Sequence, residues 1–237
     1  MKILAVDTAT PSCSVAVVDA TGPLAEFHRE EGGTHAVHLM EMIKKTLDTA
    51  GCALEEMDGI AVTRGPGSFT GVRIGMSTVK GLALACDKPV VGVSTLRAVA
   101  YQGKGDSRDI LTMIDARRAE VYYALFRWEN QKLIRLSIDA AGKVGDALGG
   151  IGRRSLLIGN GGLLHKKEIQ EKIGDLCEVA PWEDHSPRAL DVAKAAWVRF
   201  ENNEGTGPGG LSPLYLRRSD AESVHANRFS KLDHKAA

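Results

Sequence analysis

The feature that most constrains the fold of this chain is a pattern that occurs twice. The apolar run ILAVD ends on Asp7, and the run LTMID ends on Asp115. After each acid come a short polar connection, two further segments of strand composition and then a helical pattern. Internal similarity of this kind indicates a duplicated unit. A unit of three antiparallel strands followed by a helix predicts an α/β protein with two lobes.

Apolar periodicity and turn residues give the expected elements. The first half should contain strands at 2–7, 13–18, 24–29, 59–63 and 90–93 and helices at 34–50, 69–86 and 96–102. The second half should contain strands at 109–115, 120–128, 132–138 and 155–158 and helices near 144–149, 163–173 and 187–200, with one more short element at 214–217. These elements predict an N-terminal lobe at 1–103, a C-terminal lobe at 104–218 and a mobile tail at 219–237.

Charge and cysteine usage narrow the class of protein. Lys and Arg number 30, as do Asp and Glu, so the formal net charge is zero. Strong nucleic-acid binding needs an excess of basic residues, so we do not expect it from this chain alone, although a locally basic face is compatible with the total. The cysteines, at 13, 52, 86 and 177, form no C-x-x-C pair and are expected to be buried free thiols.

Targeting signals are not expected in this sequence. The apolar run at the start is short and interrupted by Asp7, unlike a signal peptide. No segment approaches the ~20 apolar residues that a membrane-spanning helix needs. We therefore expect a cytoplasmic protein without a membrane partner.

Residues 65–75, GPGSFTGVRIG, place four glycines at a junction between a strand and a helix. Such a junction can hold an anion on backbone N–H groups, or it can let two segments pack closely. Small residues continue down the helix, which favours packing, and Ser68 and Thr70 are expected to cap it. The candidate anion contacts are Arg64, Ser68 and Arg73.

The helix at 69–86 carries apolar or small residues around most of its circumference. One side can face its own sheet, and the other needs a cover, which is the helix at 34–50, another subunit or both. Burial within its own domain is the alternative. The candidate interface residues are Leu39, Met42, Ile43, Gly71, Val72, Gly75, Met76 and Val79.

The turns after Asp7 and Asp115 occupy the positions where two-lobed kinases approach a phosphate. Both turns lack the glycines that allow close approach, and each is also compatible with a turn that hydrogen-bonds its own backbone. The candidate residues of this degenerate nucleotide cleft are Asp7, Thr8, Asp115, Gly159 and Gly161.

His35 and His38 lie three residues apart, which differs from the H-E-x-x-H spacing of a metallopeptidase. No nucleophile–histidine arrangement and no Walker A motif is recognisable. We therefore assign no catalytic residue and no metal ligand.

Five segments together resemble the bacterial TsaB family, also called YeaZ. They are ILAVDTATPSCSVAV at 3–17, RGPGSFTGVRIG at 64–75, GVSTL at 92–96, IDARRAEVYYALF at 114–126 and PLYLR at 213–217. The resemblance implies a duplicated two-lobe actin/Hsp70-like fold of the ASKHA, ribonuclease H-like kind, with mixed sheets flanked by helices. It also implies a paralogue of TsaD.

The function implied by the resemblance is the formation of N6-threonylcarbamoyladenosine at position 37 of tRNA. TsaD carries the metal and transfers the threonylcarbamoyl group, the ATPase TsaE joins the assembly, and TsaB is a required, non-catalytic subunit. TsaB binds TsaD through helices of its first lobe, self-associates through the same surface and meets tRNA indirectly. No cofactor is expected to bind this chain tightly, and ATP or ADP only within the complex.

Two alternatives remain open at this point. One is an ATP-dependent phosphotransferase of the actin/Hsp70/sugar-kinase superfamily. The less favoured one is a metallopeptidase, after the older glycoprotease label, although the spacing of His35 and His38 departs from the H-x-x-x-H metal pair of TsaD.

Overall fold

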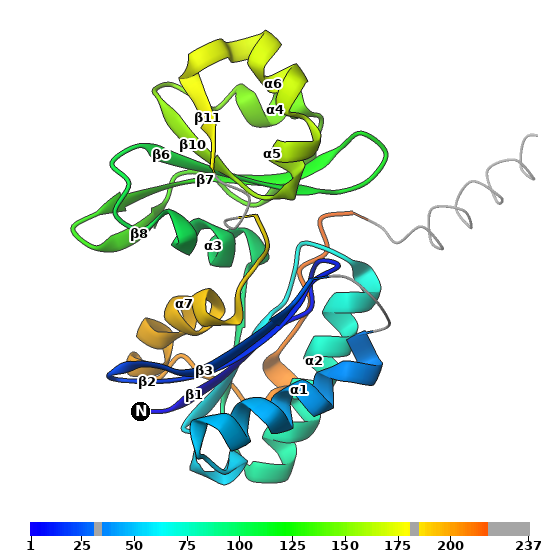
Figure 1. The fold of residues 1–237 in the computed structure, drawn as a ribbon, viewed down its shortest axis with the longest axis vertical. Helices are drawn as coiled ribbons and strands as arrows, with labels where there is room; N and C mark the ends of the chain where they lie inside the picture. Colours follow the sequence, from blue (N-terminus) through cyan, green and yellow to red (C-terminus); the bar gives the residue numbers. More distant parts are fainter. Residues whose placement is uncertain (31–34, 181–184, 218–237) are drawn as a thin grey trace, which may run out of the picture.

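The computed structural model describes residues 1–30, 35–180 and 185–217 and shows two lobes, each built on one sheet (Figure 1). The first sheet has the order β3-β2-β1-β4-β5. Its strands are β1 (Ile3–Asp7), β2 (Cys13–Asp19), β3 (Gly22–Arg29), β4 (Gly59–Thr63) and β5 (Val90–Val93). The first three strands are antiparallel, while β4 is parallel to β1 and β5 is parallel to β4.

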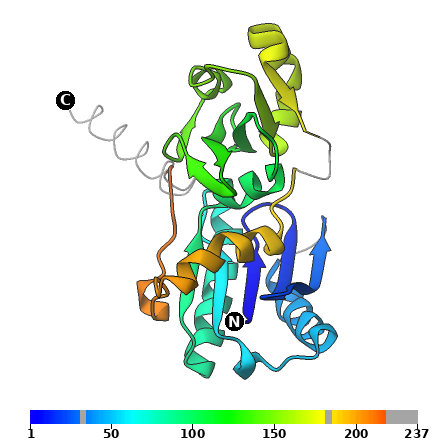
Figure 2. The same cartoon turned by 90° about the vertical axis from the view of Figure 1, so that its left-hand side faces the viewer.

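The two faces of the first sheet are covered by different helices. Helices α1 (His35–Ala50) and α2 (Phe69–Cys86) cover one face, and α7 (Ala189–Glu201) covers the other. Alternate residues of β1 separate the two layers, since Leu4 and Val6 pack toward α1 and α2 while Ile3 and Ala5 pack toward α7. Figure 2 shows α7 lying across the strands.

The second sheet repeats this order with β8-β7-β6-β10-β11, which confirms the predicted duplication. Its strands are β6 (Asp109–Asp115), β7 (Val121–Glu129), β8 (Lys132–Arg135), β10 (Ser155–Ile158) and β11 (Cys177–Val179), and the short β9 (Ala140–Gly142) pairs with β7. Helices α4 (Val144–Leu148), α5 (Asn160–Leu164) and α6 (Lys166–Ile173) lie on one side of it.

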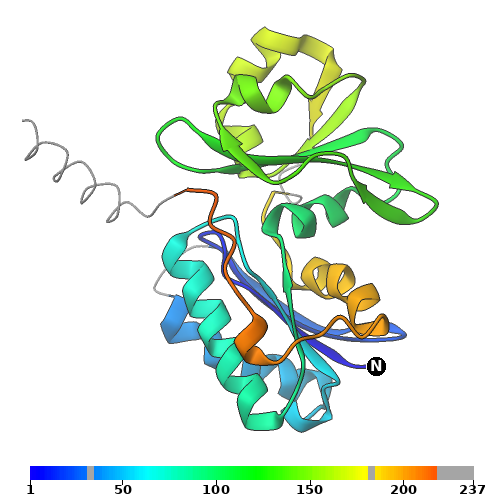
Figure 3. The ribbon, with the colours of Figure 1, turned by 180° about the vertical axis from the view of Figure 1, so that it is seen from behind.

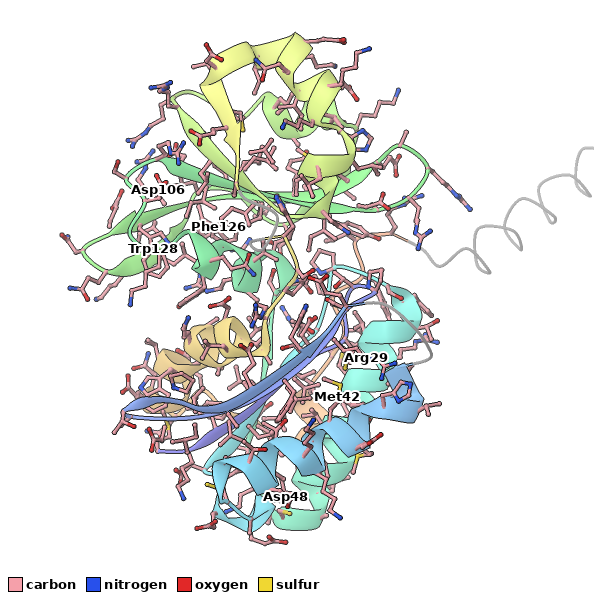
Figure 4. All side chains as sticks on the ribbon, in the orientation of Figure 1. Arg29, Met42, Asp48, Asp106, Phe126 and Trp128 are labelled. Atoms are coloured by element: carbon pink, nitrogen blue, oxygen red, sulfur yellow. The ribbon has the colours of Figure 1, made fainter. Side chains whose placement is uncertain are left out.

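Helix α3 (Thr95–Ala100) covers the other face of the second sheet. Phe126, fully buried, lies on the side of this sheet that packs against α3 (Figure 4). This packing differs from the predicted lobe boundaries, because α7 lies within the predicted C-terminal lobe and packs on the first sheet. Helix α3 contributes Leu96 and Val99 to the core of the second lobe and Ala98 to that of the first.

A segment at 205–217, which we call the strap, also returns to the first lobe (Figure 3). It contains the 3-10 turn Pro208–Gly210, and a bridge joins Thr206 to Val90. The element expected at 214–217 has no regular secondary structure. Strands β9 and β11 were not predicted, and the helix expected at 163–173 is divided into α5 and α6 at His165. The predicted tail at 219–237 lies outside the described residues.

Candidate functional site

The two repeated turns face a common cavity of about 400 Å³ between the lobes. The first lobe contributes the connection after β1 and the start of α2, and the second lobe contributes the connection after β6 and the start of α5. The strap forms a further wall. Residues of these segments that line the cavity include Ala9, Thr10, Ser68, Phe69, Asp115, Asn160, Tyr215 and Arg217.

Asp7, at the end of β1, is fully buried and does not line this cavity. Its Oδ1 accepts hydrogen bonds from Thr63 Oγ1 at 2.6 Å and from the backbone N–H of Ala9 at 3.3 Å. Its Oδ2 has no hydrogen-bond partner among the residues that the structure describes. Burial raises the pKa of the Asp7 carboxyl to about 7, against the two hydrogen bonds, which lower it.

The glycine block packs α2 against the turn that follows β1. Thr8 Oγ1 donates a hydrogen bond to the carbonyl of Gly71 at 2.7 Å, and the N–H of Ser68 donates to the carbonyl of Ala9 at 2.7 Å. A Cβ at Gly67 would lie 2.2 Å from the Ala9 carbonyl oxygen, and one at Gly71 would lie 2.1 Å from that of Thr8. Close packing is therefore confirmed as the role of these two glycines.

The first turn of α2 is capped by Ser68, as predicted, whereas Thr70 is the second residue of the helix and not its cap. Ser68 Oγ accepts a hydrogen bond from the N–H of Gly71 at 3.2 Å, so the Ser68 hydroxyl satisfies a backbone donor that the helix leaves free. Ser68 is also the one member of the predicted anion-contact set that lines the cavity.

The two arginines of the predicted anion-contact set do not line the cavity and make contacts within the protein. Arg73 Nε donates to the Tyr215 hydroxyl at 2.9 Å, and its guanidinium lies 3.8 Å from the ring centre of Phe69. Arg64 lies between β4 and the strap, and its carbonyl accepts from the N–H of Leu214 at 2.7 Å. Phe69 and Tyr215 therefore provide the contacts that the structure shows for the Arg73 guanidinium.

The turn after β6 is held by its own polar groups. Asp115 Oδ1 accepts from the N–H of Arg117 at 2.8 Å, and the N–H of Asp115 donates to Asn160 Oδ1 at 3.0 Å. Sequence reasoning missed Asn160, although its place between a strand and a glycine pair marks it as a polar group at a helix start. Asp115 does line the cavity, as predicted.

Gly159 and Gly161 do not line the cavity, which corrects their assignment to the cleft. A Cβ at Gly159, where φ is +121°, would lie 2.1 Å from the carbonyl oxygen of Met113. At Gly161 it would lie 3.0 Å from the carbonyl carbon of Ile114. Both glycines let α5 approach the backbone of β6.

Most of the predicted interface residues are buried in the core of their own lobe. Five of them belong to the core cluster between α1, α2 and the first sheet: Leu39, Ile43, Val72, Met76 and Val79. Gly71 and Gly75 are also buried and pack against Thr8. Of the predicted interface residues, only Met42 is partly exposed in the isolated chain.

The apolar side chains that α1 and α2 do expose are different ones. Val37 is 67% exposed and Met40 51% on α1, and Leu84 is 71% exposed on α2. These three are the large apolar side chains that the two helices expose to solvent among the described residues.

A metal site gains no support from the part of the chain that is described. Within residues 1–30, 35–180 and 185–217, no three His, Cys, Asp or Glu side chains are grouped so as to hold a metal ion. His38 lies on α1, and the side chain of His35 lies outside the described set. None of the helices that the structure describes is both long and apolar enough to span a bilayer.

Comparison with known proteins gives one consistent family. Residues 23–223 match the family model described as TsaD: tRNA N6-adenosine threonylcarbamoyltransferase. The chain is 30% identical over 226 residues to the tRNA threonylcarbamoyladenosine biosynthesis protein TsaB of Bacillus subtilis, covering 94% of this chain and 97% of the relative. It is 44% identical over 132 residues to the Escherichia coli protein of the same name, covering 54% and 55%.

Solved structures agree with the sequence comparison. YeaZ from Pseudomonas aeruginosa matches with a TM-score of 0.74 and 29% identity, covering 91% of this chain and 99% of that one. The activator of the 2-hydroxyisocaproyl-CoA dehydratase from Clostridium difficile matches at a TM-score of 0.50 and 12% identity, which shows the fold alone. The predicted actin/Hsp70-like class with mixed sheets flanked by helices is confirmed.

Proposed function

Because the chain belongs to the TsaB family of tRNA threonylcarbamoyladenosine biosynthesis proteins, we propose that it is a required, non-catalytic subunit in threonylcarbamoyl transfer to adenosine 37 of tRNA. In this proposal a TsaD protein carries out the transfer and a TsaE ATPase joins the assembly. The chain acts in the cytoplasm and meets tRNA through its partners, which its net charge of zero supports.

The proposal that the chain is not catalytic rests on the burial of Asp7. In a two-lobed kinase the corresponding acid helps to hold the magnesium ion of the nucleotide that binds in the cleft. Here that carboxyl is fully buried, bonded to Thr63 and Ala9, and separated from the cavity by the connection that contains Ala9 and Thr10. The residues present therefore do not fit a magnesium nucleotide, and we propose that ATP or ADP binds only within the complex.

The docking surface that we propose is the exposed face of α1 and α2. Val37, Met40 and Leu84 are large apolar side chains of these two helices that solvent reaches, and a partner that covers them would remove apolar surface from water. We propose that this face meets a TsaD protein, and that a second copy of the chain occupies it in the absence of TsaD. Met42, which is partly buried on α1, remains a proposed contact.

The experiment that tests this proposal is size-exclusion chromatography of the purified chain with the TsaD protein of the same cell. A stoichiometric complex is expected. Two separate peaks at micromolar concentrations of both proteins would contradict the proposal.

A second candidate, the ATP-dependent phosphotransferase, is favoured by one observation, the two acid-ended strands that flank the cavity. Calorimetry with Mg-ATP distinguishes it from a subunit. Micromolar binding by the isolated chain, with turnover that Asp7→Ala abolishes, would favour the phosphotransferase. Absence of binding supports the subunit.

A further inference from the structure

The strap is bound along the first lobe by backbone hydrogen bonds. Val90 and Thr206 exchange two of them, at 2.8 and 3.0 Å, and Leu211 is buried. Leu214 donates to the carbonyl of Arg64 at 2.7 Å. Figure 3 shows the strap running beside α2 toward the second lobe.

At its end the strap contacts the first turn of α2 through Tyr215. The Tyr215 ring stacks on Phe69 with centres 4.6 Å apart and planes inclined by 25°. Its hydroxyl accepts the hydrogen bond from Arg73. Phe69 and Arg73 both belong to α2, so Tyr215 holds this turn on its outer side while Thr8 holds it on the inner side.

Two residues further on, Arg217 contacts the opposite lobe. Its Nη1 donates to the carbonyl of Ala116 at 2.8 Å and lies 2.9 Å from Glu120 Oε2. These two acceptors lie on either side of Arg117, Arg118 and Ala119, whose φ angles are 64°, 56° and 57°. Successive left-handed residues other than glycine are unfavourable and persist only where their surroundings hold them.

We propose that the strap is a latch that couples the first turn of α2 to the turn at 116–120 across the cavity. Tyr215 and Arg217 line that cavity, and only Leu216 separates them, so a shift of one contact displaces the other. The turn at 116–120 then depends on the position of α2. If the proposed function holds, a partner that docks on α1 and α2 also sets the width of the cleft.

Hydrogen exchange of the full chain, followed by mass spectrometry, tests the latch without any partner. Tyr215→Ala is expected to accelerate exchange several-fold in the peptide that covers 116–121, on the opposite lobe. Arg217→Ala is expected to accelerate exchange in the first turn of α2. The matched control is Arg153→Ala. Like Arg217, Arg153 donates a hydrogen bond to a backbone carbonyl (Ser107) and lies near a carboxylate (Asp109).

The coupling is overturned if each variant changes exchange only on its own side of the cavity, or if the control produces the same changes. Thermal unfolding of every variant verifies that it is folded. If Tyr215→Ala unfolds, Tyr215→Phe and Arg217→Lys decide the question. The first keeps the ring stack and is expected to spare the turn at 116–120, whereas the second loses the guanidinium contacts and is expected to accelerate exchange in α2. The latch concerns the isolated chain, so its failure leaves the proposed function untouched.

Discussion

The hydroxyl of Thr63 donates a 2.6 Å hydrogen bond to Asp7 at a position that solvent does not reach. This pair joins the ends of two neighbouring strands, β1 and β4, directly behind the turn that packs on α2. This chain thus has an acid at the end of its first strand, and that acid is enclosed as part of the core.

Enclosure of Asp7 predicts a specific pH dependence of stability. The pKa of Asp7 is about 7 in the folded protein, whereas an unfolded Asp titrates at ~3.9. Between these values the folded state holds a proton that the unfolded state has lost. The contribution of Asp7 to stability is therefore fully present below about pH 4 and is lost as pH rises through about 7.

Asp7→Asn is expected to remove this dependence. The free energy of unfolding of the wild type, minus that of the variant, should fall by about 4 kcal/mol from pH 4 to pH 8. Urea unfolding at several pH values measures the difference. Parallel pH profiles for the two proteins would show that the Asp7 carboxyl is not perturbed as described.

The packing of Gly71 predicts a cost for any side chain at that position. A Cβ there would meet the backbone carbonyl of Thr8, which cannot move aside, so Gly71→Ala should lower the free energy of unfolding by about 1–3 kcal/mol. A Cβ added to Gly81 on the same helix would have no atom within 4 Å, so Gly81→Ala should stabilise by about 0.5–1 kcal/mol. Equal effects of both changes in urea unfolding would refute the close approach.

The exposed face of α1 and α2 predicts which substitutions affect docking. Met40→Glu and Leu84→Glu should leave the fold intact and weaken binding of the TsaD protein more than about tenfold, or about 1.4 kcal/mol. Ile138→Glu is the matched control, because Ile138 is 80% exposed on the second lobe. Calorimetric titration with TsaD measures all three, and unchanged affinity in both test variants would move the interface elsewhere.

The four cysteines are predicted to fall into two classes of reactivity. Burial raises the pKa of the Cys13 thiol to about 12 and that of Cys177 to about 11, so both should resist a thiol reagent in the native protein. Cys52 and Cys86 are only partly buried and should react. Titration with a chromogenic disulfide before and after unfolding counts the two classes, and native labelling of Cys13 would be inconsistent with this core.

Several features of the fold follow from local sequence. The paired runs that end on Asp7 and Asp115 are enough to predict the duplicated sheet, because strand composition and turn residues act locally. The sequence does not indicate to which sheet α3 and α7 belong. An apolar helix face fits either sheet, and only tertiary packing of Leu96 or Val192 decides between them.

The same limit explains the errors at the site. The small residues of α2 are compatible with an internal contact or an external one, and Thr8 makes the internal contact at Gly71 and Gly75. Arg73 is a residue type that commonly binds anions, but its Nε donates a hydrogen bond to Tyr215, which lies far away in the sequence. Long-range contacts of this kind leave no periodic signal in the chain.

Reconstitution of threonylcarbamoyl transfer to tRNA from purified components tests whether this chain is a required but non-catalytic subunit. TsaD and TsaE, with the enzyme that supplies the threonylcarbamoyl adenylate, are assayed with and without this chain, and the chain is assayed alone. Transfer is expected only when the chain and TsaD are both present, and Asp7→Asn is expected to be as active as the wild type. Transfer by the chain alone, or full transfer without it, would show that the chain is not a required, non-catalytic subunit.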